Sequence, residues 1–184
     1  MAEPQAIRYC GSCGALVEQR QVYGRIRPVC PSCGRVHFID PKVGAGVLLA
    51  QDGKILLVRR AVEPEQGKWT LPAGFVEADE DPIETAKREC QEETGLRVEI
   101  EGLLDVIHGT EHSSGASIVI VYFGTIVGGE IAASDDVDTV AFFDPMDLPP
   151  LAFEATHRAI DRWRSETQPA GRTPTVELVN RDAN

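Results

Sequence analysis

Three glutamates, Glu89, Glu92 and Glu93, stand at positions i, i+3 and i+4. If this segment is helical, their carboxylates share one face. Like charges at this spacing cost about 0.2–0.5 kcal/mol per exposed pair, and more where water is partly excluded. A hard divalent cation such as Mg²⁺ turns the repulsion into attraction because it prefers carboxylate oxygens. The spacing therefore favours metal-assisted chemistry, with a solvated helix face as the alternative.

The same segment carries signals for the start and end of a helix. Asp81 can cap it, Pro82 suits the first helical position, and Gly95 can end it in the left-handed conformation. Apolar or small side chains are expected on the face beside the acids: Ile83, Ala86, Cys90 and Thr94. The glutamates therefore flank the buried side of the helix. Arg88 lies next to them and can hold a carboxylate through two parallel hydrogen bonds.

A second group of residues suited to metal binding precedes this helix. Four of the five cysteines form the pairs Cys10/Cys13 and Cys30/Cys33, each followed by glycine. Four thiolates at this spacing are typical of a zinc site, and a site with four cysteines leaves no open position, so we expect it to be structural. Disulfides or free thiols are the alternatives, and the lack of an export signal disfavours disulfides. His37 is a further candidate ligand.

The remaining pattern indicates the elements that must position these groups. Alternating or β-branched runs predict strands at 43–50, 54–59, 69–71, 98–108, 117–127 and 137–143, with Gly128-Gly129 as a turn. Apolar residues at helical spacing predict a closing helix after Pro150: Phe153, Thr156, Ile160 and Trp163. Mixed strands with two helices indicate an α/β or α+β sandwich. We expect a zinc-binding unit over 1–40, a second domain over 41–166 and a loose tail over 167–184.

Composition narrows the class of function. The chain has 184 residues, of which 42% are hydrophobic and 26% charged, and its net charge is −11. Residues 1–40 carry +2 and the remainder −13. A protein with this much negative charge repels the phosphate backbone, and we therefore expect no nucleic-acid partner. An anionic substrate would need metal cations to bring it to the protein. No run of about 18 apolar residues and no signal peptide are visible, so we expect no membrane partner and a cytoplasmic location.

At this point the acidic helix resembles a known motif. Gly74, five residues, Glu80, seven residues, and then Arg88-Glu89-Cys90-Gln91-Glu92-Glu93-Thr94-Gly95-Leu96 resembles the complete Nudix box. The resemblance implies an α/β/α sandwich with a mixed sheet, here preceded by a small zinc ribbon. It also implies hydrolysis of a diphosphate linkage assisted by Mg²⁺ or Mn²⁺.

The resemblance assigns roles residue by residue. It implies that Glu89 and Glu93 are the main ligands of the catalytic cations, with Glu92 and the carbonyl of Ala73 completing the site. Arg88 would orient a glutamate. Gly74 would permit a tight loop, and Glu80 would brace it. The cations would offset the charge of the diphosphate and acidify the attacking water, while a carboxylate accepts its remaining proton.

Further residues are candidates for the base and for substrate contact. Asp136, in an acidic turn with Asp135 and Asp138, is our first choice of base, with Glu111 second; the alternative for the turn is ordinary solvation. Glu111 also lies in a polar loop that could reach substrate. Two other side chains are substrate-binding candidates with simpler alternatives. Trp69 could stack on a ring or pack in the core, and Arg59 or Arg60 could contact phosphate or pair with Glu63 or Glu65.

The combination of ribbon and box narrows the substrate. Over about residues 8–165 the chain resembles the FAD and ADP-ribose pyrophosphatases of plant chloroplasts and their bacterial relatives, which implies AMP with FMN or with ribose 5-phosphate as products. The Ser-Gln-Pro-Trp signature of NADH pyrophosphatases is missing. NADH pyrophosphatase, a triphosphate house-cleaning hydrolase and a non-catalytic nucleotide sensor remain alternatives. The expected partner is a small dinucleotide, and a homodimer is expected by analogy.

Overall fold

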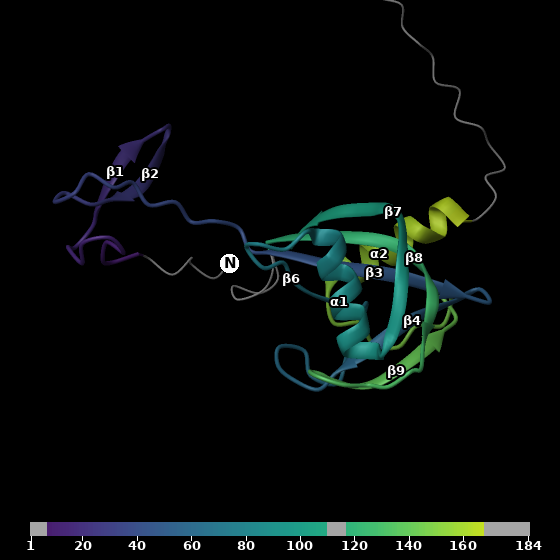
Figure 1. Ribbon diagram of the computed structural model, residues 1–184. Helices are drawn as coiled ribbons and strands as arrows, with labels where there is room; N and C mark the ends of the chain where they lie inside the picture. Colours follow the sequence, from purple (N-terminus) through teal and green to yellow (C-terminus); the bar gives the residue numbers. More distant parts are fainter. Residues whose placement is uncertain (1–6, 110–116, 168–184) are drawn as a thin grey trace, which may run out of the picture.

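The computed structural model describes residues 7–109 and 117–167. In these ranges the chain forms a two-stranded sheet, a larger mixed sheet and two helices (Figure 1). The expected α/β fold with a mixed sheet is confirmed. Within the described residues, no helix combines the length and apolarity needed to cross a membrane. Glu111 and all of the expected tail except Thr167 lie outside the described residues.

The chain forms a small sheet first and then a larger sheet with two helices. The small sheet pairs β1 (Glu18–Val22) with β2 (Arg25–Val29). The larger sheet contains β3 (Val43–Gln51), β4 (Lys54–Arg60), β5 (Trp69–Thr70), β6 (Ala73–Phe75), β7 (Leu96–His108), β8 (Ile118–Gly129) and β9 (Val137–Phe143). The helices are α1 (Pro82–Thr94) and α2 (Glu154–Thr167).

The large sheet is built around β3. Its strand order is β5-β4-β3-β8-β7, with β6 added to β3 and β9 to β4. The pair β3–β8 is parallel and the other strand pairs are antiparallel, so the sheet is mixed. Asp52 and Gly53 join β3 to β4 with φ angles of 52° and 75°. Two consecutive positive φ angles suit the hairpin turn that Asp-Gly predicts.

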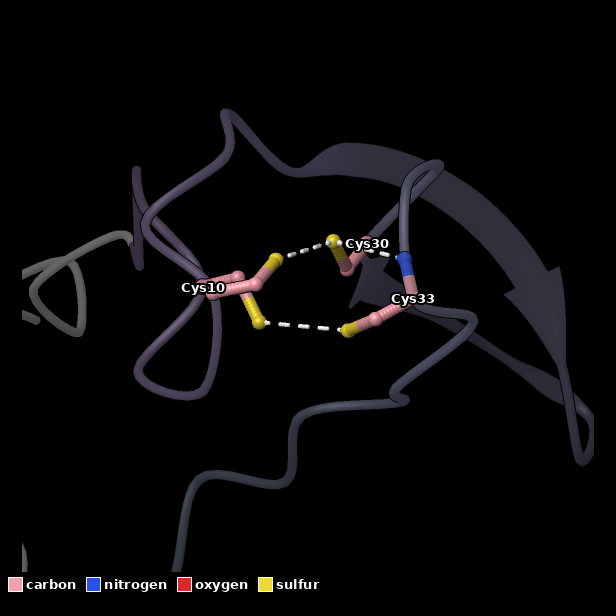
Figure 2. A group of neighbouring side chains, drawn as sticks. Cys10, Cys30 and Cys33 are labelled. Atoms are coloured by element: carbon pink, nitrogen blue, oxygen red, sulfur yellow. Dashed lines mark hydrogen bonds between the residues drawn. The ribbon is translucent and has the colours of Figure 1, made fainter.

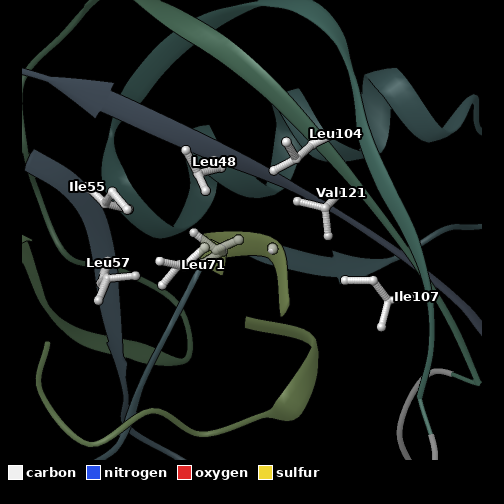
Figure 3. Packing of buried hydrophobic residues seen from close by; sticks show 9 residues of the cluster. Leu48, Ile55, Leu57, Leu71, Leu104, Ile107 and Val121 are labelled. Atoms are coloured by element: carbon white, nitrogen blue, oxygen red, sulfur yellow. The ribbon is translucent and has the colours of Figure 1, made fainter. Parts of the chain in front are cut away.

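Alternation along the central strands builds a core on each face of the sheet. Val47 and Leu49 of β3 pack with Cys90 of α1, whereas Leu48 between them packs with Ala159 and Ile160 of α2. Figure 3 shows the α2-side core around Leu48. Successive strand residues point to opposite faces, so a continuous apolar strand can serve both helices at once. The result is the helix–sheet–helix sandwich that the resemblance implied.

Helix α1 begins and ends as its sequence predicts. The Asp81 side chain accepts a hydrogen bond from the N–H of Ile83 over 2.8 Å, and Gly95 ends the helix with φ 74°. The expected apolar face needs one correction: Ile83 is 37% exposed, and the buried positions start at Thr85. Ile83 belongs to the first turn, ahead of the stretch of α1 that is buried. Glu93 is also buried, which places a carboxylate inside the fold.

One expectation about the strands was wrong, and one strand was missed. Gly128 and Gly129 do not form a turn but end β8, paired with Arg97 and Leu96. The physical reason is that β7 begins directly after α1 and offers backbone partners to these glycines. A Cβ on Gly129 would lie 2.3 Å from the carbonyl oxygen of Gly95, so only glycine fits there. The short strand β6 was not predicted, because three residues carry too little pattern.

Candidate active site and metal centre

Glu93 is the most deeply buried acid of the site. It is 4% exposed, and its Oε2 accepts a hydrogen bond from the N–H of Ala73 in β6 over 3.2 Å. Burial raises the pKa of Glu93 to about 9, and the negative charges of Asp136 and Glu89 add to the effect. A protonated acid at neutral pH marks a place where negative charge is concentrated without a compensating cation.

Arg88 ties three carboxylates together. Its Nε and Nη2 donate to the two oxygens of Glu80 over 2.8 and 2.9 Å, while Nη1 donates to Glu89 over 2.7 Å and to Glu92 over 2.9 Å. Arg88, with Thr85 as second donor, lowers the pKa of Glu80 to about 2. This network joins the segment before α1 to the helix and fixes where the Glu89 carboxylate lies.

Gly74 allows Glu89 to approach the backbone of β6. A Cβ added to Gly74 would lie 2.1 Å from both Cδ and Oε1 of Glu89. Gly74 does not belong to the described glycines with positive φ, and it pairs with Ala45 within the sheet. Its expected role in a tight loop is therefore replaced by a role in close packing. Burial raises the pKa of Glu89, and Arg88 opposes this effect.

The acidic turn before β9 divides its side chains between two tasks. Asp135 and Asp136 line the same cavity as Glu89 and Glu93. The carbonyl of Asp136 accepts a hydrogen bond from the N–H of Ala61 over 2.7 Å, which holds the turn against the end of β4. Asp138 instead accepts from Nε of Arg59 over 2.7 Å.

These acids line one part of a cavity of about 480 Å³. Its apolar walls include Leu71, Phe75, Val119, Val121, Phe153 and Ala155. Among the described lining residues, Arg60 is the sole cation. The Nε of Arg60 donates to the carbonyl of Pro64 over 2.7 Å, and its guanidinium carbon lies 5.1 Å from the centre of the Phe153 ring. The cavity therefore pairs an acidic part with apolar surface and a positioned arginine.

The residue types that line this cavity suit a hard divalent cation, although within the described residues only the four cysteines are already grouped closely enough to hold an ion. Glu89, Glu93, Asp135 and Asp136 line the cavity against the one cation of Arg60. Carboxylate oxygens are the donors that Mg²⁺ and Mn²⁺ prefer. Of these four acids only Glu93 is buried, and a bound cation would offset the repulsion that Asp136 and Glu89 exert on it.

The four cysteines of the ribbon come together as their spacing predicts. Figure 2 shows Cys10, Cys30 and Cys33 of this group. Sγ of Cys10 lies 3.6 Å from Sγ of Cys33, and Sγ of Cys13 lies 3.5 Å from Sγ of Cys30. All four sulfurs lie within 4.8 Å of one another. Four sulfurs at a Zn–S length of about 2.3 Å form a tetrahedron with edges of about 3.8 Å, so the cluster fits a structural zinc ion.

Backbone groups prepare two of these thiols to bind a metal as thiolates. The N–H of Ser12 points at Sγ of Cys10 over 3.4 Å, and this contact is the main cause that lowers the pKa of Cys10 to about 5. The N–H of Cys33 similarly lowers the pKa of Cys30. At 3.5 Å or more, the sulfurs are too far apart for the disulfides considered as an alternative.

Comparison with known proteins identifies the larger domain. A family model for the NUDIX domain matches residues 40–164, which is more than half of the chain. The chain belongs to the Nudix family. It is a Nudix hydrolase of the pyrophosphatase family.

Three relatives show which Nudix proteins the chain is similar to. It is 37% identical to the ADP-ribose pyrophosphatase of Methanocaldococcus jannaschii, over 70% of this chain and 78% of that protein. It is 30% identical to the NAD-capped RNA hydrolase NudC of Pseudomonas aeruginosa, over 94% of this chain but only 59% of that protein's length. The crystal structure of a NUDIX hydrolase from Nitrosomonas europaea superposes with a TM-score of 0.77 at 32% identity, covering 88% of this chain and 92% of the other.

The structure brings together part of the expected Nudix site. Glu89, Glu93, Ala73 and Asp136 all line the cavity. Glu92 does not line it: its side chain is 48% exposed and is held by Arg88. The geometry therefore leaves Glu92 at the edge of the acidic group.

Of the substrate-binding candidates among the described residues, Arg60 lines the cavity, and Trp69 and Arg59 do not. Trp69 packs edge-on against Phe143, with ring centres 4.6 Å apart, and does not line the cavity, which favours the core-packing alternative. Arg59 pairs with Asp138 rather than with Glu63 or Glu65, so its neighbour Arg60 is the arginine that reaches the cavity. Phe153 was assigned only to the core stripe of α2. Its role as a cavity wall has no signal in the sequence, because burial in a core and burial beside a ligand use the same apolar residue types.

Proposed function

We propose that this Nudix hydrolase cleaves the diphosphate linkage of ADP-ribose, giving AMP and ribose 5-phosphate, or of FAD, giving AMP and FMN. The observation that carries the proposal is that Glu89, Glu93 and Asp136 line one cavity together with apolar walls and Arg60. A dinucleotide has the matching distribution of properties: a charged diphosphate next to flat, weakly polar rings.

Glu89, Glu93 and the carbonyl of Ala73 would hold the catalytic Mg²⁺ or Mn²⁺, with Glu92 as an additional ligand at the edge. The chemistry supplied by these cations when bound is neutralisation of the diphosphate charge and acidification of water. Arg88 keeps the Glu89 carboxylate oriented toward this position through their 2.7 Å hydrogen bond. A metal-binding carboxylate that is already oriented in the free protein loses less conformational entropy when the substrate binds.

The remaining residues bind substrate and move the proton. Asp136, whose charge acts on Glu93, would accept the proton of the attacking water. Arg60, which lies opposite Val137 and so near the acidic turn, would contact the phosphate or sugar, held by Pro64 and by the ring of Phe153. The apolar walls exclude water, which strengthens the charge interactions of Asp136 and Arg60 with the substrate and the attacking water.

The choice of substrate rests on resemblance and on one relative. The archaeal relative at 37% identity is named an ADP-ribose pyrophosphatase, which supports ADP-ribose. FAD is supported by the resemblance of ribbon and box to the chloroplast type of pyrophosphatase. We further propose that residues 1–40 form the zinc-binding unit, that 41–166 form the catalytic domain, and that the protein is a homodimer.

The direct test is a substrate panel with the purified protein. FAD, ADP-ribose, NADH, diadenosine polyphosphates and 8-oxo-dGTP are supplied at equal concentration with Mg²⁺ or Mn²⁺, and products are separated by chromatography. We expect AMP with ribose 5-phosphate or with FMN. Glu89→Gln should abolish turnover because it removes a charged metal ligand. Glu166→Gln is the control: it removes an exposed charge of α2 that does not line the cavity, and it should leave turnover unchanged.

The alternatives have distinct signatures in the same panel. Preferred cleavage of NADH, or release of a nucleoside monophosphate or pyrophosphate from 8-oxo-dGTP alone, would replace the proposed substrate. Tight binding of ADP-ribose without turnover of any dinucleotide would reject the enzyme and favour the sensor.

A further inference from the structure

The β1–β2 hairpin of the ribbon gathers positive charge on one face. In its antiparallel register, Arg20 lies opposite Arg27, and Val22 lies opposite Arg25. Residues that face each other across strands, or stand two apart along one strand, share a face of the sheet. Three arginines therefore share this face. Glu18 lies on it too and pairs with Arg20 over 2.8 Å, which leaves the face with a net charge of +2.

Two exposed aromatic rings continue this face. The guanidinium carbon of Arg27 lies 4.7 Å from the centre of the Phe38 ring. Tyr23 stacks beside Phe38 with ring centres 6.4 Å apart and planes 14° apart. Tyr23 is 76% exposed and Phe38 is 50% exposed. Arg20, Arg25, Arg27, Tyr23 and Phe38 are called the arginine–aromatic face below.

We infer that the arginine–aromatic face binds a single-stranded polynucleotide. Guanidinium groups neutralise backbone phosphates, and exposed rings offer surfaces on which unpaired bases stack. Both features are needed for this ligand and are present on one small surface. A duplex keeps its base faces inside its own stack, so it would meet only the charge and not the rings.

The charge distribution along the chain directs such a ligand to the ribbon. The net charge of −11 led to the expectation of no nucleic-acid partner, but that value averages over unlike parts. Residues 7–40 carry five arginines against Glu18 and Asp40, whereas residues 41–184 carry −13. Charges act over about 8–10 Å at physiological salt, so a bound strand responds to the local surface and not to the total. The binding inferred here does not depend on the proposed reaction.

The test measures binding of a labelled oligonucleotide to the zinc-loaded full chain. Fluorescence anisotropy is recorded without Mg²⁺ or Mn²⁺, so that no turnover occurs, using a mixed-sequence single strand of about 12 nucleotides. With two or three phosphates neutralised, the logarithm of the affinity should fall against the logarithm of the salt concentration with a slope of about −1.4 to −2.1. Arg25→Glu should weaken binding on the order of tenfold, and Tyr23→Leu about fivefold or more.

A matched control separates this face from charge in general. Arg162→Glu makes the same change in net charge on α2, where Arg162 pairs with Glu166, and should leave the affinity within about twofold. Zinc content and hydrolysis of the small substrate establish that each variant is folded.

Several outcomes would overturn the inference. Equal weakening by Arg162→Glu would show a response to net charge alone. Unchanged affinity in both Arg25→Glu and Tyr23→Leu would show that the face is not used. Equally tight binding of a duplex of the same sequence would show that the rings do not contact bases. If Arg25→Glu alters self-association and not oligonucleotide affinity, the face is instead a contact between copies of the chain.

Discussion

At Gly74, the difference between a hydrogen atom and a methyl group decides where the Glu89 carboxylate can lie. A Cβ at Gly74 would lie 2.1–2.4 Å from the end of that side chain. Because Glu89 is flexible and Gly74 does not have a positive φ, Gly74→Ala should move the carboxylate and leave the fold intact. We expect turnover to fall about a hundredfold, the scale of a misplacement of about 1 Å.

The measurement for Gly74→Ala is turnover alongside the melting temperature. The control is Gly11→Ala, because a Cβ at Gly11 meets nothing within 4 Å. Full activity in Gly74→Ala would contradict the role given to Glu89. A large fall in the melting temperature would show that β6, and not the ligand, had given way.

The raised pKa of Glu93 predicts how stability and metal binding depend on pH. Its pKa rises from an ordinary 4.5 to about 9 in the metal-free fold. The folded protein thus keeps a proton that the unfolded chain loses, so the contribution of Glu93 to stability is fully present below about pH 4.5 and is lost as the pH rises toward 9. A divalent cation competes with that proton. The stabilisation by Mg²⁺ should therefore grow from pH 6 to pH 9.

Melting temperatures with and without Mg²⁺ across this range test the role of Glu93. Glu93→Gln should remove both the pH dependence and most of the stabilisation by Mg²⁺. Glu166→Gln on α2 is the matched control and should remove neither, because this side chain is exposed. A stabilisation by Mg²⁺ that is the same at every pH would contradict the assignment of Glu93 as a ligand.

At the scale of elements, Arg88 joins α1 to the segment that leads into it. The bidentate pair with Glu80 and the single bonds to Glu89 and Glu92 need the planar fork of a guanidinium group. Lysine keeps the charge and loses the fork, so Arg88→Lys should lower turnover about 10- to 100-fold, as is usual for residues that orient metal ligands. Mg²⁺ titrations of activity should show a weaker apparent affinity.

Glu80 provides an independent check on that network. Glu80→Gln should give a loss in the same direction as Arg88→Lys, because it breaks the anchor at the other end. If the double variant is no worse than the worse single variant, the two residues act as one unit. Losses that multiply would show instead that Arg88 and Glu80 act separately.

Elements with a strong local pattern could be predicted from the sequence, and those made by tertiary pairing could not. Helix α1 carries a cap, a periodic face and a terminal glycine, and its bounds follow from these alone. The strand β6 has three residues and exists because Ala73 and Gly74 find partners on β3. Gly128 and Gly129 read as a turn, since the sequence does not show that β7 starts at Leu96 and pairs with them.

The candidate site follows the same division. Spacing within one helix singled out Glu89, Glu92 and Glu93 together, and of these only Glu89 and Glu93 line the cavity. Arg59 and Arg60 could not be told apart, because the choice depends on whether Asp138 or the cavity lies nearby in the fold. The resemblance supplied the assignment of Ala73, which has no chemical signal in its own side chain.

At the scale of the whole molecule, the two candidate metal sites lie in parts of the chain that differ in how they are stabilised. Both apolar clusters are built only from residues after position 46. Within the described part of the ribbon, Pro28 and Val29 are the only buried residues besides Cys10 and Cys30. So small a core cannot fold a unit of about 35 residues. We therefore expect a metal bound by the four cysteines to supply the free energy that orders the ribbon.

This difference predicts what the loss of zinc does. Cys30→Ser removes one of four ligands, so the ribbon should lose zinc and become sensitive to protease between residues 7 and 40. The catalytic domain should keep its cooperative thermal transition, since none of its core residues comes from the ribbon. Cys90→Ser is the matched control: it changes a buried thiol of the α1-side core, so it should lower the catalytic transition and retain zinc. Limited proteolysis, zinc content and calorimetry separate these outcomes. If Cys30→Ser abolished the catalytic transition as well, the ribbon and the Nudix domain would fold as one unit, and the proposed boundary near residue 40 would be wrong.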